Sequence, residues 1–214
     1  MTDTFEKFAQ EYDDWFVRHE LAYQSELAAI KTLVPAHGTG LEIGVGTGRF
    51  AGPLGIEVGV EPAKAMAEIA LTRGVKVVLG YAEALPLADT SFDFTLMVTV
   101  LCFVQNLGQA LREMTRVLKP RGRLIIAMID PSSPLGRSYE ANQEKSKFYR
   151  EATFYPVGQV LKWLENLGYQ NLQTCQTIFQ DLSAIMAPEP VKEGHGEGVF
   201  VVISGEKSGA VPPC

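Results

Sequence analysis

The stretch from residue 41 to residue 50 constrains the fold more than any other part of the chain. It begins with an apolar run that contains one acid, Glu42, and continues with glycines at alternate positions, Gly44, Gly46 and Gly48. The apolar run is typical of a buried strand. Glycine accepts positive φ and lacks a Cβ, so the backbone N–H groups of such a turn can approach a ligand closely. The stretch therefore predicts a buried strand that ends in a ligand-binding turn.

A second short apolar strand is expected at residues 56–60, and it is followed by Glu61 and Pro62. An acid at this strand tip is placed to accept hydrogen bonds from both hydroxyls of a ribose. A dinucleotide-binding turn would have glycine or alanine three residues beyond Gly46, where this chain has Arg49. The Gly-Lys-Ser/Thr sequence of a P-loop is also missing. The spacing thus disfavours a nicotinamide-type dinucleotide and excludes a P-loop.

These two motifs resemble the first two motifs of class I S-adenosylmethionine-dependent methyltransferases. Residues 82–93 and 110–124 are similar to the branch that contains ubiquinone- and menaquinone-type C-methyltransferases, and the resemblance is close over about residues 38–130. It implies a three-layer α/β/α Rossmann-like sandwich whose mostly parallel seven-stranded sheet has an antiparallel last strand. It also implies S-adenosyl-L-methionine as the methyl donor and S-adenosyl-L-homocysteine as the product. It indicates almost nothing about the acceptor.

The resemblance also implies where the donor binds. Many members have an acid at the position of Tyr81 that accepts a hydrogen bond from the adenine amine. Here either Glu83 takes that role, or the Ala82 backbone N–H and apolar neighbours hold the adenine. The expected donor-binding residues in and beyond the first strand are Glu42, Gly44, Gly46, Gly48, Glu61, Pro62, Ala82, Glu83 and Thr99.

Residues 49–55 form an unusually short connection that is rich in Gly and Pro. Such a composition predicts about one helical turn where the family has a longer helix. The carboxylate of the donor is then expected to rest on backbone N–H groups of the glycine turn, with Arg49 as a candidate ion partner.

Aromatic residues recur at three- and four-residue steps in residues 3–19, which places them on one helical face. This face either packs on the core or forms a lid in which Tyr12 and Trp15 present their rings to a sulfonium cation. In the resembled branch a Tyr-Asp pair before the first strand often covers the cofactor, which favours Tyr12. Both roles are compatible. We assign residues 1–35 to an N-terminal helical cap.

A polar insert at residues 131–155 follows the predicted fifth strand. Ligands of open α/β sheets bind at the carboxyl ends of the strands, so this insert is expected to contribute acceptor specificity. The connection at residues 180–197 reaches the same edge and either walls the pocket or forms a flexible loop. The candidate acceptor-binding residues are Cys102, Phe103, Tyr139, Tyr149 and His195.

The expected reaction needs no dedicated catalytic residue, and none is assigned. Methyl transfer from a sulfonium is an in-line displacement, and alignment of the two reactants alone can supply about 7–11 kcal/mol. A base is needed only where the acceptor must lose a proton early. Conceivable bases are His19, Asp130, Glu144 and His195, none of which the sequence favours. The alternatives are a donor-binding domain without catalysis and a nucleotide-dependent oxidoreductase.

Composition narrows the class of acceptor. The chain has 214 residues, which suit one domain at residues 1–207 with a flexible tail at 208–214. Its formal net charge of −6 argues against nucleic-acid binding. No segment is apolar for long enough to span a bilayer, no leader is evident, and the three cysteines and the glycine-flanked His195 indicate neither a disulfide nor a metal site. We expect a cytoplasmic enzyme acting on a small molecule, with no prediction of oligomeric state.

Overall fold

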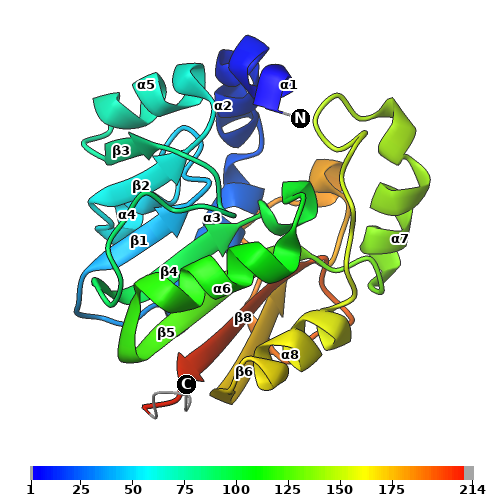
Figure 1. Cartoon of the computed structure of the whole chain (residues 1–214). Coiled ribbons are helices and arrows are strands. Elements are labelled where there is room, and N and C mark those ends of the chain that lie inside the picture. Colours follow the sequence, from blue (N-terminus) through cyan, green and yellow to red (C-terminus); the bar gives the residue numbers. More distant parts are fainter. Residues whose placement is uncertain (1, 210–214) are drawn as a thin grey trace.

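An eight-stranded sheet forms the centre of the protein, whose computed structural model describes residues 2–209 (Figure 1). The strand order is β3-β2-β1-β4-β5-β8-β6-β7. The first five strands in the chain are mutually parallel, and β8 runs antiparallel to both of its neighbours. The strands are β1 (Gly40–Ile43), β2 (Val58–Glu61), β3 (Lys76–Leu79), β4 (Phe92–Val98), β5 (Leu118–Ile129), β6 (Tyr169–Thr177), β7 (Lys192–Glu193) and β8 (Phe200–Lys207).

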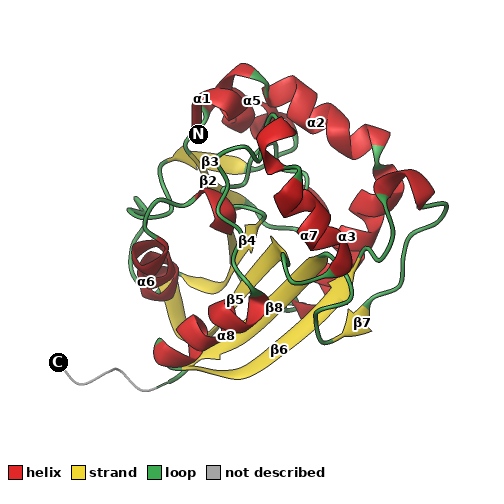
Figure 2. Ribbon diagram, turned by 90° about the vertical axis from the view of Figure 1, so that its right-hand side faces the viewer, coloured by secondary structure: helices red, strands yellow, loops and turns green. Residues whose placement is uncertain are grey.

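Helices cover both faces of the sheet, which gives the predicted three-layer Rossmann-like sandwich. One face carries α6 (Leu107–Val117) and α8 (Val157–Asn166), and the other carries α3 (Glu20–Leu33), the single turn α4 (Ala51–Leu54) and α5 (Lys64–Thr72) (Figure 2). The remaining helices, α1 (Thr2–Lys7), α2 (Ala9–Arg18) and α7 (Pro134–Ala141), lie near the carboxyl ends of the parallel strands (Figure 1).

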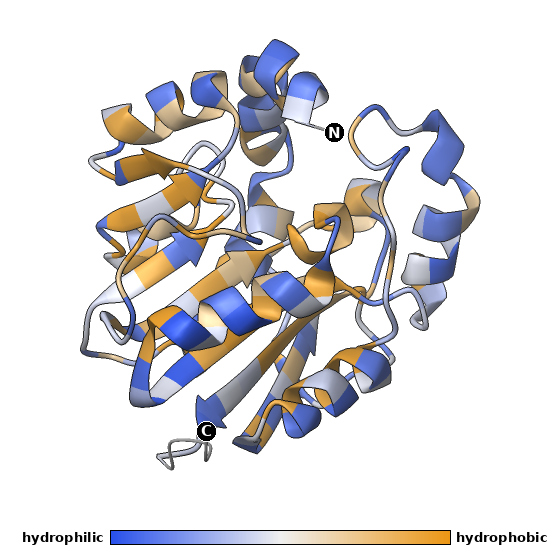
Figure 3. Cartoon of the chain, viewed as in Figure 1, coloured by the Kyte–Doolittle hydropathy of each residue, from blue (hydrophilic) through white to orange (hydrophobic). Residues whose placement is uncertain are grey.

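Side chains that alternate along the strands build two cores, one on each face. In β5, Ile126 and Met128 pack towards α6 and α8, whereas Ile125 and Ala127 pack towards α3. Because parallel strands of such a sheet are covered on both faces, they are apolar at successive positions, as Figure 3 shows for the central strands. The segment around α7 is mainly polar in the same view, as expected of an insert outside the cores.

Three local expectations differ from the structure. The sheet has eight strands rather than seven, because the two-residue strand β7 pairs with β6 at the edge. Residues 92–104 are almost wholly apolar, a pattern that predicts a central strand over the whole run. In the structure the chain leaves the sheet after Val98, where Thr99 adopts a positive φ of 52° and a 3-10 turn follows. Residues 3–19 form two helices with a break at Phe8 instead of one.

The structure describes most, but not all, of the chain ends. Residues 210–214 of the expected tail lie outside the described residues. Among the residues that are described, no helix is both long and apolar enough to cross a membrane.

Candidate functional site

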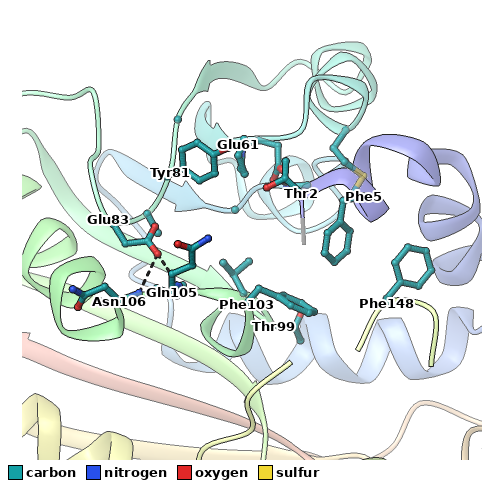
Figure 4. Close-up of a pocket in the computed structure, with 18 of the residues that line it drawn as sticks. Thr2, Phe5, Glu61, Tyr81, Glu83, Thr99, Phe103, Gln105, Asn106 and Phe148 are labelled. Carbon is teal, nitrogen blue, oxygen red and sulfur yellow. Dashed lines mark hydrogen bonds between the residues drawn. The ribbon is translucent and has the colours of Figure 1, made fainter. Parts of the chain in front are cut away.

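A cavity of about 560 Å³ opens at the carboxyl ends of β1, β2 and β4 (Figure 4). The chain leaves β1 towards β2 on one side and later returns to β4 on the other, so the cavity lies at the topological switch point of the sheet. Its walls are formed by Thr2, Phe5, Tyr12, Gly44, Gly46, Glu61, Pro62, Met66, Gly80, Tyr81, Ala82, Glu83, Thr99, Val100, Phe103, Val104, Gln105, Asn106, Gln109, Phe148 and Tyr149.

The glycine turn after β1 forms the floor of the cavity. Gly44 has a φ of 68°, and a Cβ built there would lie 2.3 Å from Cγ2 of Val100. Gly46 also has a positive φ, of 54°, but a Cβ at Gly46 would meet nothing closer than Met66 Cε at 3.6 Å. The first glycine is therefore required by close packing, and the second leaves exposed backbone on the cavity side.

Glu61 joins the tips of β1 and β2. Its Oε2 accepts a hydrogen bond from Gly46 N at 2.9 Å, and its Oε1 accepts one from Ala63 N at 2.9 Å. Burial raises the pKa of this carboxyl, an effect opposed by the two backbone hydrogen bonds. Each carboxylate oxygen has a further lone pair, so Glu61 can still accept hydrogen bonds from a ligand in the cavity.

An ion network behind the cavity fixes the other side of the glycine turn. Asp13 on α2 binds Arg49 and Arg73, with Nη2-to-Oδ2 distances of 2.5 and 2.9 Å. Arg73 also donates to the carbonyl oxygen of Thr47 at 2.7 Å. The network ties α2, the turn and the end of α5 together. Arg49, the candidate ion partner for the donor, is thus already paired with Asp13.

The end of the cavity near β3 carries polar groups. Glu83 accepts hydrogen bonds on Oε1 from the backbone N–H groups of Gln105 and Asn106, at 2.8 and 3.3 Å. Tyr81 is exposed at the rim of this end. The hydrogen bonds hold the Glu83 loop against the beginning of α6.

Aromatic rings close the opposite end (Figure 4). Phe5 is the centre of this cluster, with ring centroids 5.2 Å from Phe103, 5.5 Å from Phe148 and 5.7 Å from Tyr12. Tyr149 stacks on Phe103 with centroids 5.6 Å apart. We call these five residues the aromatic end of the cavity.

The aromatic end joins segments that are far apart in the chain. Phe5 and Tyr12 come from α1 and α2, whereas Phe148 and Tyr149 come from the insert after β5. Lys147 links the same segments, because its Nζ contacts the Glu11 carboxylate at 2.5 Å and lies 4.3 Å from the centroid of the Phe8 ring. The two segments therefore meet over the cavity.

Most of the expected donor-binding residues lie at the cavity, and three do not. Trp15 packs against Phe16 and His19 instead, with centroids 5.1 and 5.0 Å away. Gly48 packs against α5, since a Cβ there would lie 3.2 Å from Ala70. Glu42 is buried outside the lining, where burial raises its pKa, and its Oε2 has no hydrogen-bond partner among the described residues. The expected residues that do line the cavity are Tyr12, Gly44, Gly46, Glu61, Pro62, Ala82, Glu83 and Thr99.

The expected acceptor residues divide in the same way. Phe103 and Tyr149 line the cavity. Cys102 donates from Sγ to the Thr99 carbonyl oxygen at 3.3 Å, and burial raises the pKa of its thiol to about 12, as expected of a packing residue rather than a nucleophile. Tyr139 lines a separate hollow beside α7, and His195 is exposed on the loop after β7. Chain order placed both near the carboxyl edge of the sheet, but neither reaches this cavity.

Several lining residues were not singled out from the sequence as site residues. Phe5 belongs to the N-terminal aromatic face. Phe148 adjoins Tyr149 in an otherwise polar insert, and an aromatic pair in a charged segment is the sequence signal that could have indicated a site residue there. Gln105 and Asn106 carried a weaker one, because they directly precede α6, which Asn106 caps by accepting a hydrogen bond from Gln109 N. Their contact with Glu83 depends on the tertiary fold.

Comparisons with known proteins indicate a methyltransferase. Residues 41–126 match a family model described as a methyltransferase domain. A crystal structure from Thermotoga maritima, described as an SAM-dependent methyltransferase and possible histamine N-methyltransferase, is 52% identical, with a TM-score of 0.94 over 97% of this chain and 100% of that one. An uncharacterised protein of Methanocaldococcus jannaschii is 48% identical over 96% of this chain and 99% of its own length. The demethylmenaquinone methyltransferase of Staphylococcus aureus is 28% identical over 62% of this chain and 68% of its own.

Proposed function

The chain belongs to the S-adenosylmethionine-dependent methyltransferases, and from that premise we propose that its cavity binds the donor and that it methylates a small-molecule acceptor by in-line displacement. The observation that carries the proposal is the Glu61 carboxylate, which is bonded to Gly46 N at 2.9 Å and faces the cavity. One wall of the cavity thus combines a carboxylate that can accept hydrogen bonds from a ribose with the exposed backbone of Gly46.

The residues of the cavity fit the donor in their chemistry. Ribose hydroxyls would donate to the remaining lone pairs of Glu61. The backbone at Gly46 is open to the amino-acid end, and Glu42, whose Oε2 has no hydrogen-bond partner among the described residues, adds a carboxyl group behind the turn. The adenine would lie towards Ala82 and Glu83, which remain the two candidates for its recognition.

The donor, when bound, supplies a methyl group that is already activated by the sulfonium. The protein residues then hold the two reactants in line and exclude water. The alignment alone can lower the activation free energy by about 7–11 kcal/mol. The aromatic end places rings on the side of the cavity away from Glu83 (Figure 4). We place the acceptor there, between the N-terminal helices and the insert.

Calorimetric titration with S-adenosyl-L-methionine, S-adenosyl-L-homocysteine and NADH tests the donor. We expect the two adenosyl compounds to bind and NADH to give no signal. Methyl release over a panel of small amines, phenols, quinols and acids then tests catalysis. Donor binding without turnover of any panel member would favour a donor-binding domain, and NADH binding alone would overturn the proposal.

Replacing Tyr12 with alanine should lower the affinity for the donor by about 2- to 30-fold, because a ring near a sulfonium contributes about 0.5–2 kcal/mol. Tyr12→Phe keeps the ring and should bind nearly as the parent chain does. Trp15→Ala is the control, since it removes a ring from the same helix outside the cavity. If Tyr12→Ala lowers the melting temperature strongly and leaves affinity unchanged, the residue serves the core alone.

A further inference from the structure

The described residues that line the cavity carry charge of one sign only. Of its lining residues, only Glu61 and Glu83 carry a formal charge near neutral pH, and no lysine, arginine or histidine is among them. Arg49 and Arg73 lie behind the turn, outside the lining, where both are paired with Asp13, which offsets one of their two positive charges. A carboxylate or phosphate on the acceptor would therefore enter an acidic cavity without a cation to bind it, which is costly.

Buried carboxyl groups also lie behind the walls of the cavity. Glu26 on α3 lies close enough to Tyr12 and Tyr149 for its charge to contribute to raising the pKa of both phenols, in addition to their burial. Glu42 and Glu61 act on Tyr12 in the same direction. Burial raises the pKa of Glu26 to about 8 and the pKa of Glu42 well above its ordinary value, so both carboxyl groups are largely protonated near neutral pH. A cationic ligand in the cavity would favour their ionised forms and be stabilised by them, whereas an anionic ligand would not.

The aromatic end has the matching chemistry. Phe5, Phe103 and Phe148 approach one another from three segments and, together with Tyr12 and Tyr149, line the cavity. Figure 4 shows Phe5 and Phe148 on the side of the cavity away from Glu83 and Asn106. The negative faces of aromatic rings attract ammonium groups and are a recurrent means of binding methylated amines.

The aromatic end offers no base for an alcohol or phenol. The phenols of Tyr12 and Tyr149 have raised pKa values and stay protonated near neutral pH, where they cannot accept a proton. Glu83 is bonded to the beginning of α6, and Glu61 to the glycine turn. An acceptor that attacks without prior deprotonation by the protein fits this end best.

We propose that the acceptor is an amine, which the aromatic end and the carboxyl groups in and behind the lining select over alcohols and acids. The inference rests on the proposed function of the same cavity. The ammonium form of a primary or secondary amine has no lone pair, so it first gives one proton to water. The nitrogen lone pair of the free amine then forms the N–C bond while the C–S bond breaks and its electron pair goes to sulfur. Positive charge thus passes from sulfur to nitrogen inside the cavity, and a primary or secondary amine then releases its proton to water. The site retains a cation on both sides of the reaction.

Three probes of nearly equal shape test the selection. Choline carries a trimethylammonium group, 3,3-dimethylbutan-1-ol is its uncharged carbon isostere, and 3,3-dimethylbutanoate carries a negative charge. Each is titrated calorimetrically into the protein saturated with S-adenosyl-L-homocysteine. We expect choline to bind at least tenfold more tightly than the alcohol, and the acid not to bind. Equal affinities for choline and the alcohol, preference for the acid, or no measurable choline binding would overturn the inference.

A matched pair of variants locates the binding. Phe148→Leu removes a ring of the aromatic end and should reduce the preference for choline over the alcohol by at least threefold. Phe179→Leu removes a ring outside the cavity, over which Lys192 lies, and should keep the preference. An unchanged preference in Phe148→Leu would contradict the placement.

Turnover provides the second readout. 2-Phenylethylamine should yield S-adenosyl-L-homocysteine and a methylated amine, whereas 2-phenylethanol and phenylacetate should not. Methylation of the alcohol or the acid but not the amine would overturn the inference and leave the proposed function intact. Failure of S-adenosyl-L-homocysteine to bind in the first titration would instead count against the proposed function, so the two failures are distinguishable.

Discussion

Replacing Glu61 with alanine should weaken donor binding about 10- to 100-fold. The carboxylate is expected to accept charged hydrogen bonds from the ribose, which contribute about 1.5–3 kcal/mol. It also holds Gly46 N at 2.9 Å, so its loss frees the glycine turn that would meet the other end of the donor. Both effects act in the same direction, and calorimetric titration with S-adenosyl-L-homocysteine measures their sum.

Two variants separate charge from general damage. Glu57→Ala removes an exposed carboxylate just before the same strand and should leave affinity within about twofold. Glu61→Gln keeps the size of the side chain but removes the charge, and we expect it to lie between the parent chain and Glu61→Ala. Unchanged affinity in Glu61→Ala would remove the main support for a ribose at this position.

The pH dependence of binding gives an independent check on Glu61. Burial raises the pKa of this carboxyl above its ordinary value. As the pH falls, the group should therefore become protonated earlier than an exposed glutamate and lose one acceptor site. On acidification, the donor affinity of the parent chain should decline as this carboxyl becomes protonated. Glu61→Gln lacks this protonation step, so its affinity should not show the same decline.

The glycine turn and Glu61 could be predicted because their geometry is encoded locally. Glycines at alternate positions impose a turn whatever surrounds them, and an acid at the next strand tip must lie beside it once two adjacent strands are parallel. The short α4 followed from the same kind of evidence, since a proline and two glycines within residues 49–55 cannot support a longer helix. The structure confirms these local features.

The aromatic end could not be predicted from local patterns. The ring centroids of Phe5 and Phe148 lie 5.5 Å apart, although Phe5 is near the start of the chain and Phe148 lies in the insert after β5. The break in the N-terminal helix at Phe8 has no glycine or proline to signal it, and the Phe8 ring instead lies beneath Lys147 of the distant insert. Such features depend on how two segments meet over the cavity, which spacing within one segment does not encode.

Apolar composition alone also misplaced the end of β4. The residues after Val98 remain largely apolar, so the pattern favoured a longer strand. In the structure Thr99 turns the chain out of the sheet. The side chain of its neighbour Val100 then fills the space that a Cβ at Gly44 would need. A buried turn and a buried strand have the same composition, and only the partner of each side chain distinguishes them.

Replacing Asp13 with asparagine should lower the free energy of unfolding by about 3 kcal/mol, near the lower end of the range for breaking a buried ion pair. The Asp13 side chain is 6% exposed, whereas those of Arg49 and Arg73 are 19% and 27% exposed. Their partial access to water limits the cost of leaving two guanidinium groups without a counter-ion. Because the network also holds the Thr47 carbonyl, the glycine turn should loosen and donor affinity should fall as well. Chemical denaturation at neutral pH measures the first effect.

The pH dependence of this difference identifies the charge as its cause. Burial alone would raise the pKa of Asp13, but the hydrogen bonds and charge of its arginine partners outweigh it and lower the pKa to about 2. A carboxyl whose pKa is lowered by folding contributes stability that is present above its unfolded pKa of about 3.9 and is lost as the pH falls through its folded pKa. The stability gap between the parent chain and Asp13→Asn should therefore be constant near neutral pH and shrink between about pH 4 and pH 2. Asp14→Asn is the control, since the adjacent carboxylate accepts a hydrogen bond only from Gln10 among the described contacts and should show a small gap throughout. A gap for Asp13→Asn that persists unchanged at pH 2 would mean that the shape of the side chain, and not its charge, holds α2 against the turn.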